Sequence, residues 1–207
     1  MGTVKAYNTQ LEDMRLRVAR GEIAVGPDAA RRLAAQTQLA MQPHPLPALD
    51  PKTKVLPWHE RRKAAVVDIQ GTLINVDAIR HLVEGKVKYF DEFHEQTMAQ
   101  PINEEILEEV REDSAKGLAI LFLTGMTERF RHPLGWYLGN HDVPGEGLWM
   151  RPNHLFVSDV ALKTWRYREI SRQFQVVKAT DDNPNILALW EELEIPVIRR
   201  VPGWREV

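Results

Sequence analysis

Residues 65–73 read AVVDIQGTL, an apolar run that ends in an acid and continues into a Gly-Thr pair. A short apolar run bounded by turn residues is typical of a strand buried in a parallel sheet. The acid, Asp68, then lies at the carboxyl end of the strand, where open α/β sheets place their binding sites. The stretch therefore predicts a phosphate-site loop, in which Gln70 stands where a second acid would be expected.

The composition excludes several classes of protein. The chain has 207 residues, 43% of them hydrophobic, which is enough for one domain of ordinary size with an appendage. It has no cysteine, so disulfides, thiolate catalysis and thiolate zinc sites are excluded. The net charge of -2 gives no general attraction to nucleic acid or membrane. We find no signal peptide and no apolar run of about 18 residues, and we expect a soluble, cytoplasmic protein with no membrane partner.

Residues 1–60 differ from the rest of the chain in composition and in the pattern of their apolar residues. The spacing of apolar residues predicts helices over 11–25 and 28–42, both with narrow apolar faces. Five prolines in residues 43–57 predict an extended connector. We expect this N-terminal arm to pack on the main domain or on a second copy of the chain, which would give a homo-oligomer. An arm that binds nucleic acid is the alternative.

Strand and helix patterns alternate through residues 61–207, which we interpret as one domain. This rhythm predicts an α/β fold with a parallel sheet and helices on both faces. The expected strands cover residues 63–69, 118–124, 154–158, 175–180 and 196–201. The expected helices cover residues 102–117, 127–142, 159–174 and 182–194, the second of them with a possible bend near Pro133.

Polar residues, with one glycine among them, gather at the expected strand ends and at the start of one helix: Asp68, Gln70, Thr124, Gly125, Lys163, Asp181 and Asp182. Each of them alone has an ordinary structural explanation, as a helix cap, a turn residue or a solvated lysine. Together they supply carboxylates for a hard divalent cation, and a lysine and a hydroxyl for phosphate oxygens. The set predicts phosphoryl-transfer chemistry, in which an aspartate can serve as the nucleophile.

The order Asp-x-x-Gly-Thr, apolar-Thr-Gly, Lys and Asp-Asp resembles the haloacid dehalogenase (HAD) superfamily of phosphohydrolases. Residues 118–207 also resemble the phosphatase domain of bacteriophage and bacterial polynucleotide kinases. The stretches that carry this likeness are LFLTGMTERFR, LWMRPN, SDVALKTWRYREI and VVKATDDNPNILALWEELEIPVIRRVPG. The resemblance implies a Rossmannoid sheet with a small or absent cap, and residues 72–93 lie where the superfamily places its flap. No GxxxxGKS/T loop is present, so no kinase half is implied.

The resemblance also implies a role for each matched residue. A magnesium ion would be held by Asp68, the backbone carbonyl of Gln70, Asp181 and Asp182. Asp68 would also be the nucleophile. Thr124 would hydrogen-bond the transferring phosphoryl group, and Lys163 would neutralise this group and orient Asp68. A carboxylate that attacks a phosphate dianion needs such a cation and such donors to offset the repulsion.

The sequence departs from the family pattern directly after Thr-Gly, where relatives usually have arginine and this chain has Met126. Arg129, Arg131 or Arg151 could supply the missing positive charge. We expect Gly125, Arg129 and Arg151 to contribute to substrate binding, with Arg151 as the preferred replacement.

Gln70 is the second departure, because the family has an acid two residues after the nucleophile. That acid protonates the leaving group and then activates water, whereas glutamine forms hydrogen bonds without transferring a proton. Loss of a general acid or base costs about 10²–10⁴-fold in rate. Three interpretations stay open: a phosphohydrolase with altered acid catalysis, a pseudo-phosphatase that binds phosphate or nucleic acid, and a phosphotransferase or engineered trapping variant. The resemblance implies as substrate a phosphorylated small molecule, a nucleotide or a nucleic-acid end with a 3′-phosphate.

Overall fold

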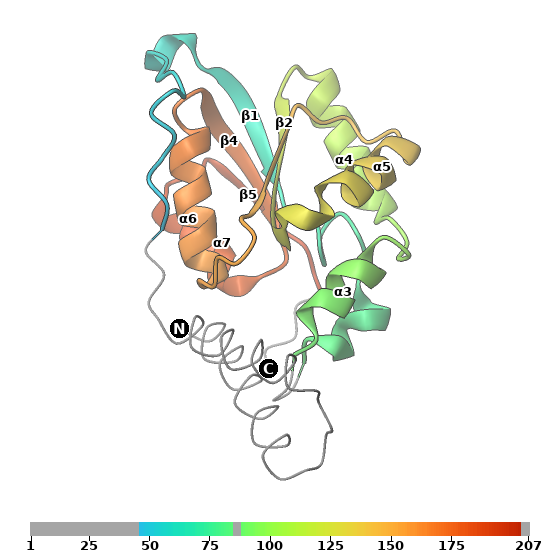
Figure 1. Cartoon of the computed structure of the whole chain (residues 1–207). Coiled ribbons are helices and arrows are strands. Elements are labelled where there is room, and N and C mark those ends of the chain that lie inside the picture. Colours follow the sequence, from blue (N-terminus) through green and yellow to red (C-terminus); the bar gives the residue numbers. More distant parts are fainter. Residues whose placement is uncertain (1–45, 85–87, 204–207) are drawn as a thin grey trace.

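The computed structural model describes residues 46–84 and 88–203, and its centre is a five-stranded parallel sheet in the order β3-β2-β1-β4-β5 (Figure 1). The strands are β1 (Arg62–Val67), β2 (Ala119–Thr127), β3 (Gly147–Arg151), β4 (Phe174–Asp181) and β5 (Val197–Arg200). The α-helices are α3 (Phe90–Thr97), α4 (Glu104–Ala115), α5 (Arg131–Asn140), α6 (Asp159–Ile170) and α7 (Pro184–Glu192). Three 3₁₀ turns, η1 (Trp58–Glu60), η2 (Asp77–Leu82) and η3 (Glu128–Phe130), join them.

The central strand β1 is apolar on both faces because helices cover the sheet from both sides. Ala65 and Val67 belong to a cluster with side chains of α4 and α5, whereas Ala64 and Val66 belong to a second cluster with side chains of α6 and α7. Figure 1 shows α4 and α5 on one side of the sheet and α6 and α7 on the other. Alternate residues of a strand point to opposite faces, and a parallel sheet is stable only when both are covered. The predicted fold class is confirmed.

One predicted strand is wrong. Residues 154–158 form no strand, and the third strand is Gly147–Arg151, which pairs in parallel with β2 through Leu121 opposite Gly147. In the predicted range, Leu155 packs from a loop against a small apolar cluster on α6. The reason for the error is the edge position of β3, because an edge strand is half-covered and lacks a long apolar run.

The segment between β1 and α4 contains two elements that the sequence pattern did not reveal. These are η2 and α3, and they occupy the region in which the flap was expected. Figure 1 shows α3 beyond the end of the sheet at which β1 finishes. Within the described residues, the cover over that edge is therefore a 3₁₀ turn and one short helix.

The two helices predicted in the N-terminal arm lie outside the described residues. Within residues 46–57, the described part of the predicted connector, the structure has neither helix nor strand. The backbone N–H of Leu56 donates to the carbonyl of Arg172 (2.8 Å), and the Arg172 guanidinium donates to the carbonyl of Asp50 (2.7 Å). The connector therefore runs along the end of α6. Among the described helices, none is both long and apolar enough to cross a membrane.

Candidate active site

Three acids meet at the carboxyl edge of the sheet. Asp68 follows β1, Asp181 is the last residue of β4, and Asp182 comes directly after it. Because β1 and β4 are parallel neighbours, their ends lie side by side. One carboxylate oxygen from each acid lies within 4.8 Å of the other two, and all three residues are buried. The structure thus brings together residues that are more than a hundred positions apart in the sequence.

Lys163 enters this cluster from α6. The helix begins after Ser158, whose Oγ accepts a hydrogen bond from the N–H of Ala161 (3.2 Å). One turn further on, the Lys163 ammonium donates to Asp68 Oδ1 and to Asp181 Oδ2, both at 2.7 Å. The lysine is 3% exposed, so α6 fixes the orientation of both carboxylates from within the protein.

The charges of the cluster do not balance without a cation. Three carboxylates exceed the ammonium of Lys163 by two negative charges, and the guanidinium of Arg80, 3.5 Å from Asp182 Oδ2, offsets only one of them. Burial raises the pKa of Asp68 well above its ordinary value, against the opposing effect of Lys163. Burial and Asp181 raise the pKa of Asp182 to about 6. For Lys163, burial alone would lower the pKa, but the carboxylates of Asp181 and Asp68 outweigh it and raise the pKa. A divalent cation would offset the excess negative charge and keep the acids ionised.

Arg80 is the second cation beside the acids, and sequence reasoning missed it. Its Nη2 lies 3.5 Å from Asp182 Oδ2, a buried oxygen that accepts no hydrogen bond within the described part of the chain. An open carboxylate oxygen in a set of three acids suits a hard divalent cation such as Mg²⁺, which prefers oxygen ligands. Arg80 comes from η2, in the flap region, where no periodic pattern singles it out.

Thr124 and Gly125 lie beside the acids in the last part of β2. The Thr124 Oγ1 accepts a hydrogen bond from the N–H of Met126 (3.2 Å), and its own hydrogen has no acceptor among the described residues. That hydroxyl is therefore free to donate to a phosphate oxygen. Met126 is fully buried in the apolar core, so this residue supplies no charge to the site.

The two arginines predicted to bind substrate are both engaged within the protein. Arg151 donates to Gly125 O and Asp159 Oδ1, and to the carbonyls of two residues of the following loop, which uses four of its five N–H groups. Arg129 pairs with Asp91 of α3, and its guanidinium lies 4.7 Å from the ring centroid of Phe130. Arg151 thus clamps the loop around Gly125, whereas Arg129 joins it to the flap helix. Their part in substrate binding stays a prediction.

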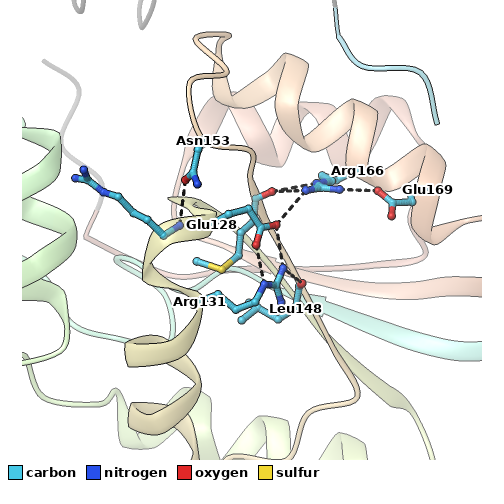
Figure 2. Close-up of polar contacts among 8 residues, drawn as sticks. Glu128, Arg131, Leu148, Asn153, Arg166 and Glu169 are labelled. Carbon is cyan, nitrogen blue, oxygen red and sulfur yellow. Dashed lines mark hydrogen bonds and ion pairs between the residues drawn. The ribbon is translucent and has the colours of Figure 1, made fainter. Parts of the chain in front are cut away.

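An ion-pair network fastens the loop that follows Gly125 (Figure 2). Glu128 of η3 accepts from Arg131 (2.6 Å) and lies 3.4 Å from Arg166 of α6. Arg166 also donates to the carbonyl of Met150 in β3 (2.6 Å), and the backbone N–H of Arg129 donates to Asn153 (3.0 Å). The loop is therefore tied to both β3 and α6, which holds Thr124 and Gly125 in place.

The flap helix α3 contacts this loop through a buried histidine, His94. Its ring lies edge-on to Phe130, with centroids 5.6 Å apart, and its Nδ1 has no hydrogen-bond partner in the described structure. Burial, and next the charge of Arg151, lower the pKa of His94 to about 4, although Asp91 and Asp159 oppose the shift. His94 is therefore neutral at physiological pH.

His94 should make the protein less stable in mild acid. Its pKa is about 6.5 unfolded and about 4 folded, so its contribution is present above pH 6.5 and is lost as the pH falls toward 4. We expect the difference in unfolding free energy between wild type and His94→Phe to change by about 2–3 kcal/mol over this range. Urea unfolding with Mg²⁺ present measures it, and exposed His81→Gln is the control. An equal change in both variants would contradict the assignment.

Gly71 must lack a side chain because the backbone passes close to Asp182. It has φ +88°, and a Cβ there would lie 2.2 Å from Asp182 Oδ2 and 3.2 Å from Arg80 Nη2. We expect Gly71→Ala to displace Asp182 and to weaken Mg²⁺ binding at least tenfold, as measured by calorimetry. Gly117→Ala is a matched control, because Gly117 has φ +86° but no atom within 4 Å of the added Cβ. Both variants carry the backbone penalty of about 1 kcal/mol, and Gly117→Ala should keep normal affinity.

Comparison with solved structures finds other chains of the same fold. A chain of the Pnkp1/Rnl/Hen1 RNA repair complex is similar with a TM-score of 0.61 and 18% identity, over 87% of this chain and 58% of that one. A second structure of the Pnkp1/Rnl/Hen1 complex matches with the same TM-score and identity, over 78% and 53%. This chain therefore spans less than two thirds of the length of either. The class C acid phosphatase from Bacillus anthracis with tungstate bound has a TM-score of 0.53 and 10% identity, over 97% and 77%.

Sequence comparison identifies the family. Among curated proteins, no sequence matches this chain significantly. A family model, however, matches residues 62–203, which is more than half of the chain, and its description is "Polynucleotide kinase PNKP phosphatase domain". The predicted resemblance is confirmed, and the chain belongs to the family of polynucleotide kinase phosphatase domains within the HAD-like phosphatases.

Proposed function

We propose that the protein is a Mg²⁺-dependent phosphomonoesterase that acts through an aspartyl-phosphate on Asp68. The observation that carries this proposal is the cluster of Asp68, Asp181 and Asp182 at the carboxyl edge of the sheet, in which one buried lysine bridges Asp68 and Asp181. Asp68 is the nucleophile because Lys163 orients its Oδ1 and it directly follows β1. The metal would be held by Asp68, Asp182 and the backbone carbonyl of Gln70, with Asp181 beside it, and would neutralise charge on the phosphoryl group.

In the first step, an oxygen of Asp68 attacks phosphorus and the bond from phosphorus to the ester oxygen breaks. The hydroxyl of Thr124 donates to a phosphoryl oxygen. The departing oxygen must gain a proton, which the amide of Gln70 does not provide. Activated esters, whose leaving group needs no proton, should therefore react faster than alkyl esters. The ratio of the two rates should be larger here than in an enzyme that has an acid at position 70.

We propose a nucleic-acid end with a 3′-phosphate as the substrate. The matched family is the phosphatase domain of polynucleotide kinase, and two similar structures are of an RNA repair complex. Within the described residues, only η2 and α3 lie between β1 and α4, and this small cover also favours a bulky substrate. Nucleotides and other phosphorylated small molecules are the competing substrates.

The test is phosphate release from oligonucleotides that carry the phosphate at either end. With Mg²⁺, we expect release from the 3′-phosphorylated strand at a higher kcat/KM than from the 5′-phosphorylated strand or from a free 3′-nucleotide. A preference for the free nucleotide would contradict the nucleic-acid assignment. Release from none of them, including an aryl phosphate, would contradict the enzyme itself.

A binding module without turnover is the second candidate, and Gln70 is the observation that favours it. It predicts that a 3′-phosphorylated oligonucleotide binds but is recovered intact. Calorimetry beside the phosphate-release assay separates the two functions, because only the enzyme consumes its ligand.

A further inference from the structure

Gln70 is held by a specific partner on the flap helix. Its amide Nε2 donates to Thr97 Oγ1 at 2.6 Å, although the two residues are 27 positions apart. Thr97 is the last residue of α3 and is fully buried. This short hydrogen bond links the loop that follows β1 to the flap helix α3. The link is made by Gln70, the residue that departs from the family pattern.

The hydroxyl hydrogen of Thr97 decides how the amide is oriented. Thr97 Oγ1 donates to the carbonyl of Phe93 one turn earlier at 2.8 Å, so the side of the oxygen that faces Gln70 carries a lone pair. Only the NH₂ end of the amide satisfies that lone pair. An ionised carboxylate at position 70 would face it oxygen to oxygen, so this environment matches an amide.

The other end of the amide stays available. Gln70 Oε1 accepts no hydrogen bond within the described part of the chain, and it is not among the side-chain oxygens sealed from solvent. The flap helix itself is held in place, because Asp91 pairs with Arg129, and the Tyr137 hydroxyl donates to the carbonyl of Gln100 just after α3 (2.8 Å). Because Thr97 is held in place, its hydrogen bond to Nε2 also sets the direction in which Oε1 of Gln70 points.

We propose that Thr97 is a positioning residue, and that it holds Gln70 so that Oε1 accepts a hydrogen bond from the water that hydrolyses the phosphorylated Asp68. This inference rests on the proposed function and assigns the residue that orients water in the second step. An amide fits that task, since glutamine orients the attacking water in some GTP hydrolases without taking its proton.

The step balances without a base. The water oxygen attacks phosphorus, the bond from phosphorus to the Asp68 oxygen breaks, and its electron pair returns to the carboxylate. The acyl phosphate dianion and water give the Asp68 carboxylate and H₂PO₄⁻, which keeps both protons of the water. The leaving carboxylate is a weak base, so orientation of water is the contribution that remains for position 70.

The experiment follows the two steps separately with p-nitrophenyl phosphate and Mg²⁺ in rapid-quench measurements. Release of p-nitrophenol reports phosphorylation of Asp68, and decay of acid-trapped phosphoprotein reports its hydrolysis. We expect Thr97→Val to slow hydrolysis about 10–100-fold with little change in phosphorylation, so that phosphoprotein accumulates. Thr97→Ser keeps the hydroxyl and should restore hydrolysis close to wild type.

The double variant decides whether Thr97 acts through Gln70. In a Gln70→Ala background, Thr97→Val should cause no further slowing, because the group it positions is gone. An undiminished effect in that background, or equal slowing of both steps, would overturn this inference and leave the phosphatase in place. If wild type forms no phosphoprotein and releases no p-nitrophenol, the proposed function is wrong and this inference falls with it.

Discussion

Asp68→Asn is expected to lower Mg²⁺-dependent phosphate release by on the order of 10⁴-fold or more, because it removes the nucleophile. Asparagine has the same shape, and its Oδ1 can still accept the hydrogen bond that Lys163 donates at 2.7 Å in the wild type. The measurement is the rate of phosphate release from an aryl phosphate, which needs no acid on the leaving group.

Stability separates this loss of activity from a loss of folding. The substitution removes one of three crowded negative charges, and burial already raises the pKa of Asp68 well above its ordinary value. Metal-free Asp68→Asn should therefore unfold at the same or a higher urea concentration than wild type. Comparable phosphate release by the two proteins would remove Asp68 from the mechanism.

Lys163→Met should give the largest loss of stability. The ammonium bridges Asp68 and Asp181, and its removal leaves buried carboxylates without their main counter-charge. Loss of one partner from a buried ion pair costs about 3–5 kcal/mol, and we expect this range for the metal-free protein at pH 7. Mg²⁺ should recover part of the loss, since it binds the folded state and replaces some of the positive charge.

Lys178→Met is the matched control for this effect. Lys178 likewise lies between two carboxylates, Asp113 at 2.6 Å and Glu109 at 3.5 Å, but it is only partly buried and lies between β4 and α4, away from the cluster. Its replacement should cost less, and Mg²⁺ should not recover the loss. Urea unfolding of both variants with and without Mg²⁺ measures the difference. If Mg²⁺ restored the same amount of stability to both variants, the metal would not be binding at the carboxylates beside Lys163.

The sequence predicts the central strands and the edge strand β5, but it misplaces the edge strand β3. Residues 118–124 form one continuous apolar run because β2 is paired on both sides and covered on both faces. The burial of this strand is therefore visible in its own sequence. The edge strand β3 is only partly covered, and its pattern was too weak to be preferred over residues 154–158. Order along the chain also predicted the acids at the strand ends, because parallel strands end at one edge.

The contacts that distinguish this site were not predictable from local pattern. Thr97 of α3 contacts Gln70, and Arg80 of η2 contacts Asp182. The path of these two flap elements depends on tertiary packing, which the spacing of residues in the sequence does not reveal. The engagement of Arg151 with Gly125 and Asp159 was equally hidden, because a charged residue looks the same in a sequence whether it faces solvent or clamps a loop. Such details follow from tertiary structure alone.

The most direct test of the account is the mass of the protein after acid quench during turnover of an aryl phosphate with Mg²⁺. We predict a species heavier by one phosphoryl group, localised to Asp68 by fragmentation and absent from Asp68→Asn. Because Gln70 does not act as a base, this species should be present at a measurable steady-state level in wild type. Turnover in which neither wild type nor slowed variants carry a phosphoryl group on Asp68 would contradict the aspartyl-phosphate mechanism.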